Sequence, residues 1–185
     1  MQDPIQLDQP SLTKRLLRNI AGLLTVGTYT LMAPFGWAFF AVLSFAWRRH
    51  PVVCARRLQR IQVFAFRCMH TWLRISGITD FDYHAPLPGL PDGPCVIIAN
   101  HPTLMDITAI TAMVGGGCTI AKPALFRRMT LRRLLIGAGH VEGPGPDLIS
   151  AGRVVDEVGE RLRQGFRVII FPEGTRSPPG RLLHF

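Results

Sequence analysis

The chain has 185 residues, of which 48% are hydrophobic, and a formal net charge of +9. This length suits one domain with a sizeable core. The charge is uneven, because residues 14–74 hold ten basic residues and no acidic one, whereas residues 75–185 are nearly balanced. A basic excess beside apolar sequence favours an anionic membrane surface as partner, and the absence of a basic-aromatic recognition motif argues against nucleic acid.

The first fifty residues hold the longest uncharged stretch. Ser11 suits a helix N-cap. Further along, the stretch from Asn19 to Trp47 contains no charged side chain. As one straight helix it would span about 43 Å, more than the ~30 Å bilayer core. Pro34-Phe35-Gly36 interrupts it, and basic residues flank both ends. We therefore predict a membrane-embedded helical hairpin in residues 1–50, attached to the cytoplasmic face, which is the inner membrane if the source is bacterial.

Two alternatives to this hairpin stay open. The stretch is also compatible with a single tilted span or with a pair of buried core helices. A cleaved signal peptide is disfavoured, because the apolar run is too long and no small-residue cleavage site follows it.

Residues 51–80 predict a basic amphipathic helix, from Pro51 to about Ser76. Four of its arginines fall within about 40° of one another at 100° per residue, and apolar residues gather on the other side. We expect the apolar side to pack on the domain and the arginines to lie against lipid phosphates. The arginines are Arg56, Arg60, Arg67 and Arg74, and the apolar set is Cys54, Leu58, Ile61, Ala65, Cys68 and Trp72.

Residues 81–185 alternate strand and helix patterns after a Pro/Gly-rich loop. Such alternation predicts an α/β layered domain with a mixed, largely parallel sheet flanked by helices. The expected strands are 95–99, 118–121, 138–141 and 167–171, and the expected helices are about 104–114, 124–136 and 147–164. The cysteines form no CxxC pair and no metal-ligand pattern, so we predict no metal site.

A candidate base follows the first of these strands. His101 stands where the apolar run 95–99 ends, Pro102 suits the first turn of a helix, and Asp106 lies five residues after the histidine. A carboxylate on one ring nitrogen fixes the tautomer and leaves the other nitrogen free to accept a proton. By itself this spacing is weak evidence, because such pairs are more often unrelated.

A second polar stretch, Phe171-Pro172-Glu173-Gly174-Thr175-Arg176, follows the last strand. Gly174 allows a tight turn and close approach of a ligand. Arg176 offers a planar fork for a phosphate or a carboxylate. Glu173 either bonds an acceptor hydroxyl or forms an ion pair with Arg176 that only staples the turn.

Together these stretches resemble the signatures of the glycerophospholipid acyltransferase family, of the 1-acylglycerol-3-phosphate (PlsC-like) type. Those signatures are a His–four residues–Asp (HX4D) box and an FPEGTR box. The resemblance covers roughly Val96 to the C-terminus. It implies transfer of a fatty acyl group from acyl-CoA or acyl-carrier protein to a hydroxyl of a lysophospholipid-like acceptor, with membrane lipids as partners and no cofactor.

The resemblance also assigns roles. His101 is the expected general base and Asp106 its orienting partner, while Glu173, Gly174, Thr175 and Arg176 are expected to bind the acceptor. Lys122 and Arg127 lie in a stretch similar to the family's lysine-containing segment after its second strand. They either contact phosphates of donor or acceptor, or are solvated surface charges.

Two departures from the family pattern stand out. Gly143 occupies the position of an arginine in a G-x-x-x-I-x-R-like box, which weakens the case for lysophosphatidate as acceptor. The chain stops at Phe185 without the family's Pro-containing fourth box, so we expect the C-terminal part of the fold to be missing. Two alternatives therefore stay open: an acyltransferase for a specialised lipid such as an aryl polyene, or a catalytically idle membrane-binding fragment.

Overall fold

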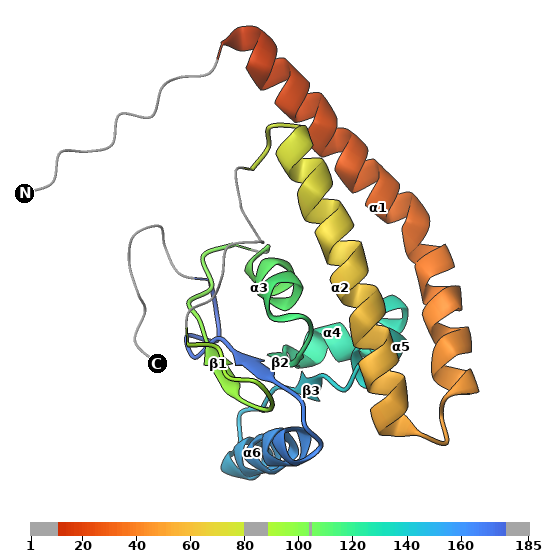
Figure 1. Ribbon diagram of the computed structural model, residues 1–185, viewed down its shortest axis with the longest axis vertical. Coiled ribbons are helices and arrows are strands. Elements are labelled where there is room, and N and C mark those ends of the chain that lie inside the picture. Colours follow the sequence, from red (N-terminus) through yellow and green to blue (C-terminus); the bar gives the residue numbers. More distant parts are fainter. Residues whose placement is uncertain (1–10, 80–88, 104, 177–185) are drawn as a thin grey trace, which may run out of the picture.

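The computed structural model describes residues 11–79, 89–103 and 105–176, which form two long helices followed by an α/β domain (Figure 1). The helices are α1 (Leu12–Ala46), α2 (Pro51–Ile75), α3 (Asp106–Val114), α4 (Pro123–Arg127), α5 (Met129–Gly137) and α6 (Leu148–Arg163). The strands are β1 (Val96–Ile98), β2 (Cys118–Ala121), β3 (Val141–Glu142) and β4 (Val168–Ile170).

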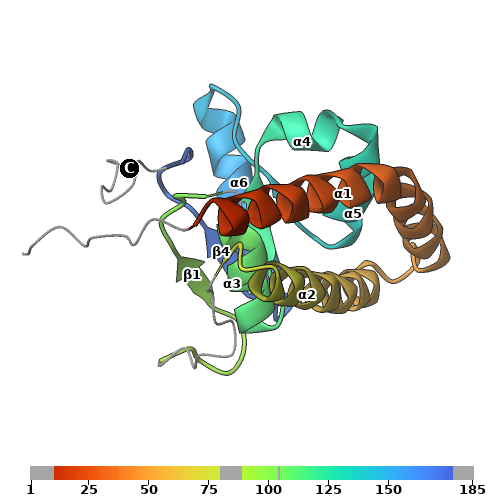
Figure 2. The same cartoon turned by 90° about the horizontal axis from the view of Figure 1, so that it is seen from above.

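The four strands form one sheet in the order β1-β4-β2-β3, and every adjacent pair is parallel. The last strand in the sequence thus lies between the first and the second, with Val96 beside Val168 and Ile98 beside Ile170. Helices α2 and α3 lie on one side of the sheet and α6 on the other (Figures 1 and 2). The predicted helix-flanked, largely parallel α/β sheet is confirmed.

The element boundaries differ from the prediction in three places. The strand expected over 138–141 is found at β3 (Val141–Glu142), because α5 extends to Gly137 and its C-cap is Ala138. Helix α3 begins at Asp106, so Pro102 lies in the preceding turn and not in a first helical turn. The helix expected over 124–136 is divided into α4 and α5, because Arg128 has an extended backbone with ψ of 114°.

The hairpin predicted inside residues 1–50 is not seen, since α1 is one helix of 35 residues that continues through Pro34. Ser11 caps it, and Figure 1 shows α1 as a bent rod antiparallel to α2. An internal proline removes one backbone hydrogen bond and kinks or breaks a helix. Here packing of Phe40 and Leu43 on the buried cluster around Leu58 holds the second half in place. No helix in the described ranges has the length and apolarity needed to cross a bilayer.

Helix α2 uses two different faces for packing. Cys54 and Leu58 are buried with Ala138 against side chains of α1, whereas Ala55 packs with Cys118 and Val168 of the sheet. Part of the predicted apolar side therefore contacts α1 and the region after α5, while Ala65, Cys68 and Trp72 on that side are exposed.

The α2 face turned toward the α/β domain is unexpectedly polar. Gln59, Gln62 and His70 are all buried there. Gln59 Nε2 donates to the carbonyl oxygen of Ala138 over 2.8 Å, and Gln62 lies 3.3 Å from the ring of His140. Such directed bonds fix the position of the helix along the sheet more strictly than apolar contacts do.

The His140 ring links this face to the sheet. Its Nδ1 accepts a hydrogen bond from the backbone N–H of Thr119 over 3.0 Å, so Nε2 carries the proton of the neutral ring, and the acceptor for that proton is the amide oxygen of Gln62 rather than its nitrogen. Burial lowers the pKa of His140 to about 4, and the positive charge of Arg161 acts in the same direction. His140 is therefore neutral near pH 7.

Gly137 of α5 lies close to side chains of both α1 and α2. A Cβ atom there would lie 2.6 Å from a methyl carbon of Leu58 and 2.7 Å from Oγ of Ser44. Leu58 is fully buried and has little freedom to move. We therefore predict that Gly137→Ala lowers the free energy of unfolding by about 1–3 kcal/mol, the usual cost of overpacking.

Chemical denaturation measures the free energy of unfolding of Gly137→Ala and, in parallel, of a control variant, Gly152→Ala. Gly152 also lies inside a helix but has open space around its Cβ position, so alanine there should raise the free energy of unfolding by up to about 1 kcal/mol. Equal stabilisation by both substitutions would show that the three helices do not meet closely at Gly137.

Candidate active site

The two polar boxes lie at the same edge of the sheet. His101 follows β1, the segment 171–176 follows β4, and Lys122 follows β2. Because the strands are parallel and β1 and β4 are neighbours, both boxes emerge side by side at the carboxyl ends. This edge is where open α/β sheets usually bind their ligands.

His101 and Asp106 form the predicted pair. His101 Nδ1 lies 3.0 Å from Oδ2 of Asp106, and the side chains are 22% and 19% exposed. A carboxylate oxygen only accepts, so Nδ1 donates the hydrogen and Nε2 keeps its lone pair. The histidine is thus set up as a base whose proton-accepting atom is Nε2.

Asp106 is held in turn by Thr103. The Thr103 backbone N–H donates to Oδ2 and the Thr103 hydroxyl to Oδ1, each over 2.6 Å. Asp106 is also the first residue of α3, where the partial positive charge of the helix N-terminus favours a carboxylate. Burial acts to raise the pKa of Asp106, but the hydrogen bonds from Thr103 and His101 outweigh it and keep the pKa below its ordinary value.

Phe171 joins the two boxes directly. Its ring stacks on the His101 imidazole with 4.4 Å between centroids and 26° between planes. The stack covers one face of the imidazole, and an aromatic face also stabilises a cation lying on it. Neither Thr103 nor Phe171 carried a predicted role, although both lie within the two boxes.

The turn after Phe171 exposes the predicted acceptor-binding residues. Gly174 has φ of +59° and donates its N–H to the carbonyl oxygen of Phe171 over 3.1 Å, a conformation that side chains rarely adopt. Thr175 and Arg176 are exposed and Glu173 is half-buried. Within the described residues no ion pair joins Glu173 to Arg176.

Lys122 and Arg127 lie at the two ends of helix α4, and Lys122 directly follows the carboxyl end of β2. Lys122 is the N-cap residue and Arg127 the last helical residue, and both are exposed. Neither contacts the His101–Asp106 pair. In the parts of the chain described by the structure, no three His, Cys, Asp or Glu side chains are grouped so as to hold a metal ion.

Gly143 follows β3 and lies against the end of β2. Its N–H donates to the carbonyl oxygen of Ala121 over 2.8 Å, and a Cβ atom would lie 3.2 Å from that same oxygen. A side chain at this position would need a shift of the backbone by a few tenths of an ångström.

The structure thus places a carboxylate-bound histidine beside an arginine-bearing turn at the carboxyl edge of a parallel sheet. The sequence pattern of the Acyltransferase family matches residues 80–185. The chain therefore belongs to the acyltransferase family, with relatives of the PlsC-like type.

Proteins similar in sequence to this chain are named as 1-acyl-sn-glycerol-3-phosphate acyltransferases. Two are the 1-acyl-sn-glycerol-3-phosphate acyltransferase of Cocos nucifera, 35% identical over 49% of this chain, and the human 1-acyl-sn-glycerol-3-phosphate acyltransferase beta, 32% identical over 50%. The matched segments make up only 30% and 34% of those proteins. The crystal structure of the 1-acyl-sn-glycerophosphate acyltransferase PlsC from Thermotoga maritima superposes with a TM-score of 0.61, at 26% identity, covering 92% of this chain and 66% of that one.

The hydrogen bond from the Thr103 hydroxyl leads to a prediction about the pKa of Asp106. Thr103→Val removes the hydroxyl donor to Oδ1, so the pKa of the Asp106 carboxyl should rise toward or above its ordinary value and His101 should be held less firmly. Carboxyl titration by NMR measures this pKa, and Thr103→Ser, which keeps the hydroxyl, is the control. An unchanged Asp106 titration in Thr103→Val would mean that the hydroxyl does not stabilise the carboxylate.

Proposed function

We propose that the chain is an O-acyltransferase of the 1-acylglycerol-3-phosphate type. It moves a fatty acyl group from a thioester, carried on coenzyme A or on acyl-carrier protein, to a hydroxyl of a lysophospholipid-like acceptor. The observation that carries this proposal is the 3.0 Å bond between His101 Nδ1 and Asp106, which leaves Nε2 available as a base.

His101 acts on the acceptor hydroxyl. Nε2 takes the hydroxyl proton while the oxygen attacks the thioester carbonyl carbon. The tetrahedral intermediate then collapses, the carbon–sulfur bond breaks, and the imidazolium returns the proton to the departing thiolate. Asp106 and the Phe171 ring stabilise the imidazolium between these steps. No acyl-enzyme intermediate is required.

The acceptor is held by exposed cationic side chains. Arg176, Lys122 and Arg127 are exposed, and their side chains make no hydrogen bond or ion pair with other described residues. Guanidinium and ammonium groups at such positions suit a phosphate-bearing headgroup. The names of the relatives support 1-acylglycerol 3-phosphate, whereas Gly143 supports a less charged lipid.

Removing the base tests the mechanism. His101→Ala should lower the rate of acyl transfer by about 10²- to 10⁴-fold, the usual contribution of a general base, and Asp106→Asn should be nearly as damaging. The measurement is release of free thiol from an acyl-CoA or acyl-carrier-protein donor, with circular dichroism to verify folding. Near-normal turnover in folded His101→Ala protein would refute the mechanism. Lipid binding without thiol release by the unsubstituted chain would favour the idle-fragment alternative.

A competition assay identifies the acceptor class. A phosphate monoester carries close to two negative charges, and the arginine that would help to neutralise them is absent at Gly143. We therefore predict slower use of lysophosphatidate than of a neutral or zwitterionic hydroxy-lipid offered at equal concentration, measured by mass spectrometry of the acylated products. A preference for lysophosphatidate would show that the exposed cations suffice and would end the case for a specialised acceptor.

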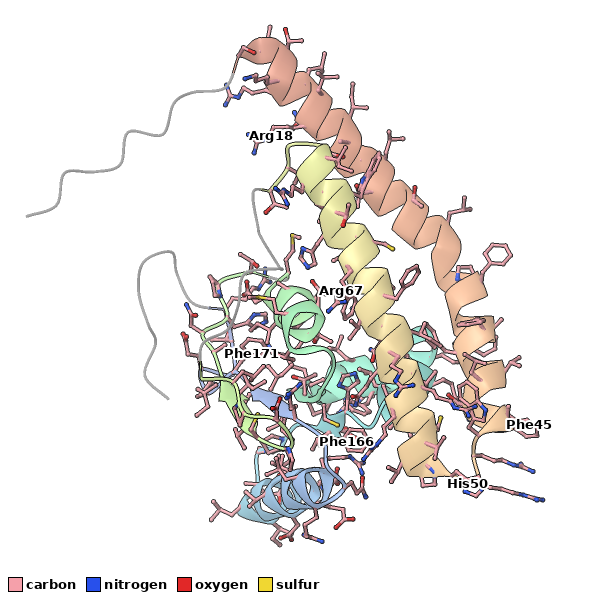
Figure 3. All side chains as sticks on the ribbon, viewed as in Figure 1. Arg18, Phe45, His50, Arg67, Phe166 and Phe171 are labelled. Atoms are coloured by element: carbon pink, nitrogen blue, oxygen red, sulfur yellow. The ribbon has the colours of Figure 1, made fainter. Side chains whose placement is uncertain are left out.

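Membrane association is the second part of the proposal. Many large apolar side chains of α1 are exposed, including Leu12, Leu23, Leu31, Phe35, Val42 and Phe45 (Figure 3). Asn19 to Trp47 has no charge, and basic residues flank it. Such a surface favours the interfacial region of a membrane, with its basic ends toward anionic lipid on the cytoplasmic face.

Substitution of this surface provides the test. Replacing Leu23, Leu31 and Val42 with glutamine should reduce co-flotation of the chain with vesicles of phosphatidylglycerol and phosphatidylcholine by about tenfold or more, because each buried apolar side chain contributes ~1.5–3 kcal/mol. A triple substitution of exposed residues on α6 (Leu148, Ile149 and Val155) is the matched control. Equal flotation of both variants would contradict a role for α1.

A further inference from the structure

A cavity lies at the end of the sheet opposite to the candidate active site. Its volume is about 260 Å³, and it is bounded by the residues that precede β1, β2 and β4 together with the N-terminal half of α2. Figure 3 labels Phe166, in its wall, and Phe171, in the active site, at the two ends of β4. Three arginines line the cavity: Arg56, Arg60 and Arg167.

Two of these arginines are positioned by backbone carbonyl groups. Arg56 Nη2 donates to the carbonyl oxygen of Gln164 over 3.0 Å, and its guanidinium lies 5.7 Å from the centroid of the Phe166 ring. Arg167 donates to the carbonyl oxygens of Val114 and Pro91 over 2.6 and 3.1 Å. A guanidinium has five N–H donors, so each keeps further donors after these bonds.

Arg60 differs from these two arginines, because its side chain makes no hydrogen bond or ion pair within the described residues. Like Arg56, it is exposed. The ion pairs found in the described part of the chain involve His101, Arg153 and Arg163 instead. No carboxylate there neutralises any of the three arginines of the cavity.

The net charge of the cavity decides which kind of ligand suits it. The bonded carbonyls of Val114 and Gln164 lie at the C-terminal ends of α3 and α6, and each such end carries roughly −0.5 charge. The two helix ends together therefore offset about one of the three positive charges of the arginines. Close to two remain, which matches a phosphate group.

Glycines keep the cavity open. Gly116 and Gly165, which lie in its wall, have φ of +116° and +84°. A Cβ atom at Gly165 would approach Arg56 Nη2 to 3.2 Å, and one at Gly116 would approach Gln59 Oε1 to 3.3 Å. Side chains at these positions would displace the polar groups that line the cavity.

We propose that this cavity is a second anion-binding site, separate from the acyl-transfer site, which takes the phosphate group of a ligand between Arg56, Arg60 and Arg167. Its volume lies below the ~300–1,000 Å³ of sites for drug-sized ligands. A headgroup or a free phosphate fits, whereas a whole lipid does not. The phosphate comes either from a lipid headgroup or from a soluble phosphate compound.

The test uses the full chain with ¹⁵N-labelled glycine in zwitterionic micelles. Adding inorganic phosphate should shift the amide signals of Gly115, Gly116 and Gly165 in a saturable way, whereas Gly174 reports separately on the active site. If the natural source is a lipid headgroup, phosphatidic acid in the micelles should shift the same three signals at lower concentration than inorganic phosphate does.

Arg60→Gln should weaken this binding by about fivefold to tenfold, the loss expected for one charge-assisted contact. Arg153→Gln, which removes the same charge from an exposed position on α6, is the matched control and should leave the affinity unchanged. The proposal fails if neither phosphate source shifts the three signals, or if Arg60→Gln binds as tightly as the unsubstituted chain. Since Gly174 and acyl transfer are measured independently, failure here leaves the proposed enzymatic function standing.

Discussion

The insertion of β4 between β1 and β2 is the constraint on which the rest of the domain depends. Backbone bonds run from Val168 N–H to the Cys95 carbonyl and from Ala99 N–H to the Ile170 carbonyl, while Cys118 N–H donates to the Arg167 carbonyl. The β1–β4 bonds align residues about 70 positions apart, so that Phe171 reaches the His101 ring. An error of one residue in this pairing would turn the β4 side chains to the opposite faces and break the stack.

A second constraint is the polar, buried face of α2. A helix packed only by apolar contacts can slide along a sheet at small cost, whereas the bonds of Gln59 to Ala138 and of His70 to Thr108 require one position. Thr108 lies two residues after Asp106 on α3. The N-terminal helices therefore help to hold α3, the helix that carries Asp106, in addition to presenting an apolar surface.

Much of the site could be predicted because its signals are local. The apolar runs, the position of His101 after β1 and the glycine in the turn after β4 each depend on a few neighbouring residues. The central position of β4 has no such signal, because strand pairing depends on contacts far apart in the sequence. The hairpin prediction failed for a related reason: the local cost of Pro34 is offset by packing of α1 residues on α2, which the local pattern does not contain.

The arginines of α2 show how position in the fold changes the meaning of a periodic pattern. The sequence places four arginines on one stripe, which suits a membrane surface: Arg56, Arg60, Arg67 and Arg74. In the structure Arg67 donates to the carbonyl oxygen of Ala112 at the side of α3 (Figure 3), and Arg56 and Arg60 turn toward the amino ends of the strands. Three of the four arginines are thus divided between structural bonds and a cavity, and Arg74 is exposed. Since Lys122 and Arg176 lie at the carboxyl ends, the domain presents positive charge at both ends of one sheet. The proposed acceptor site and the proposed second anion site therefore use different cations.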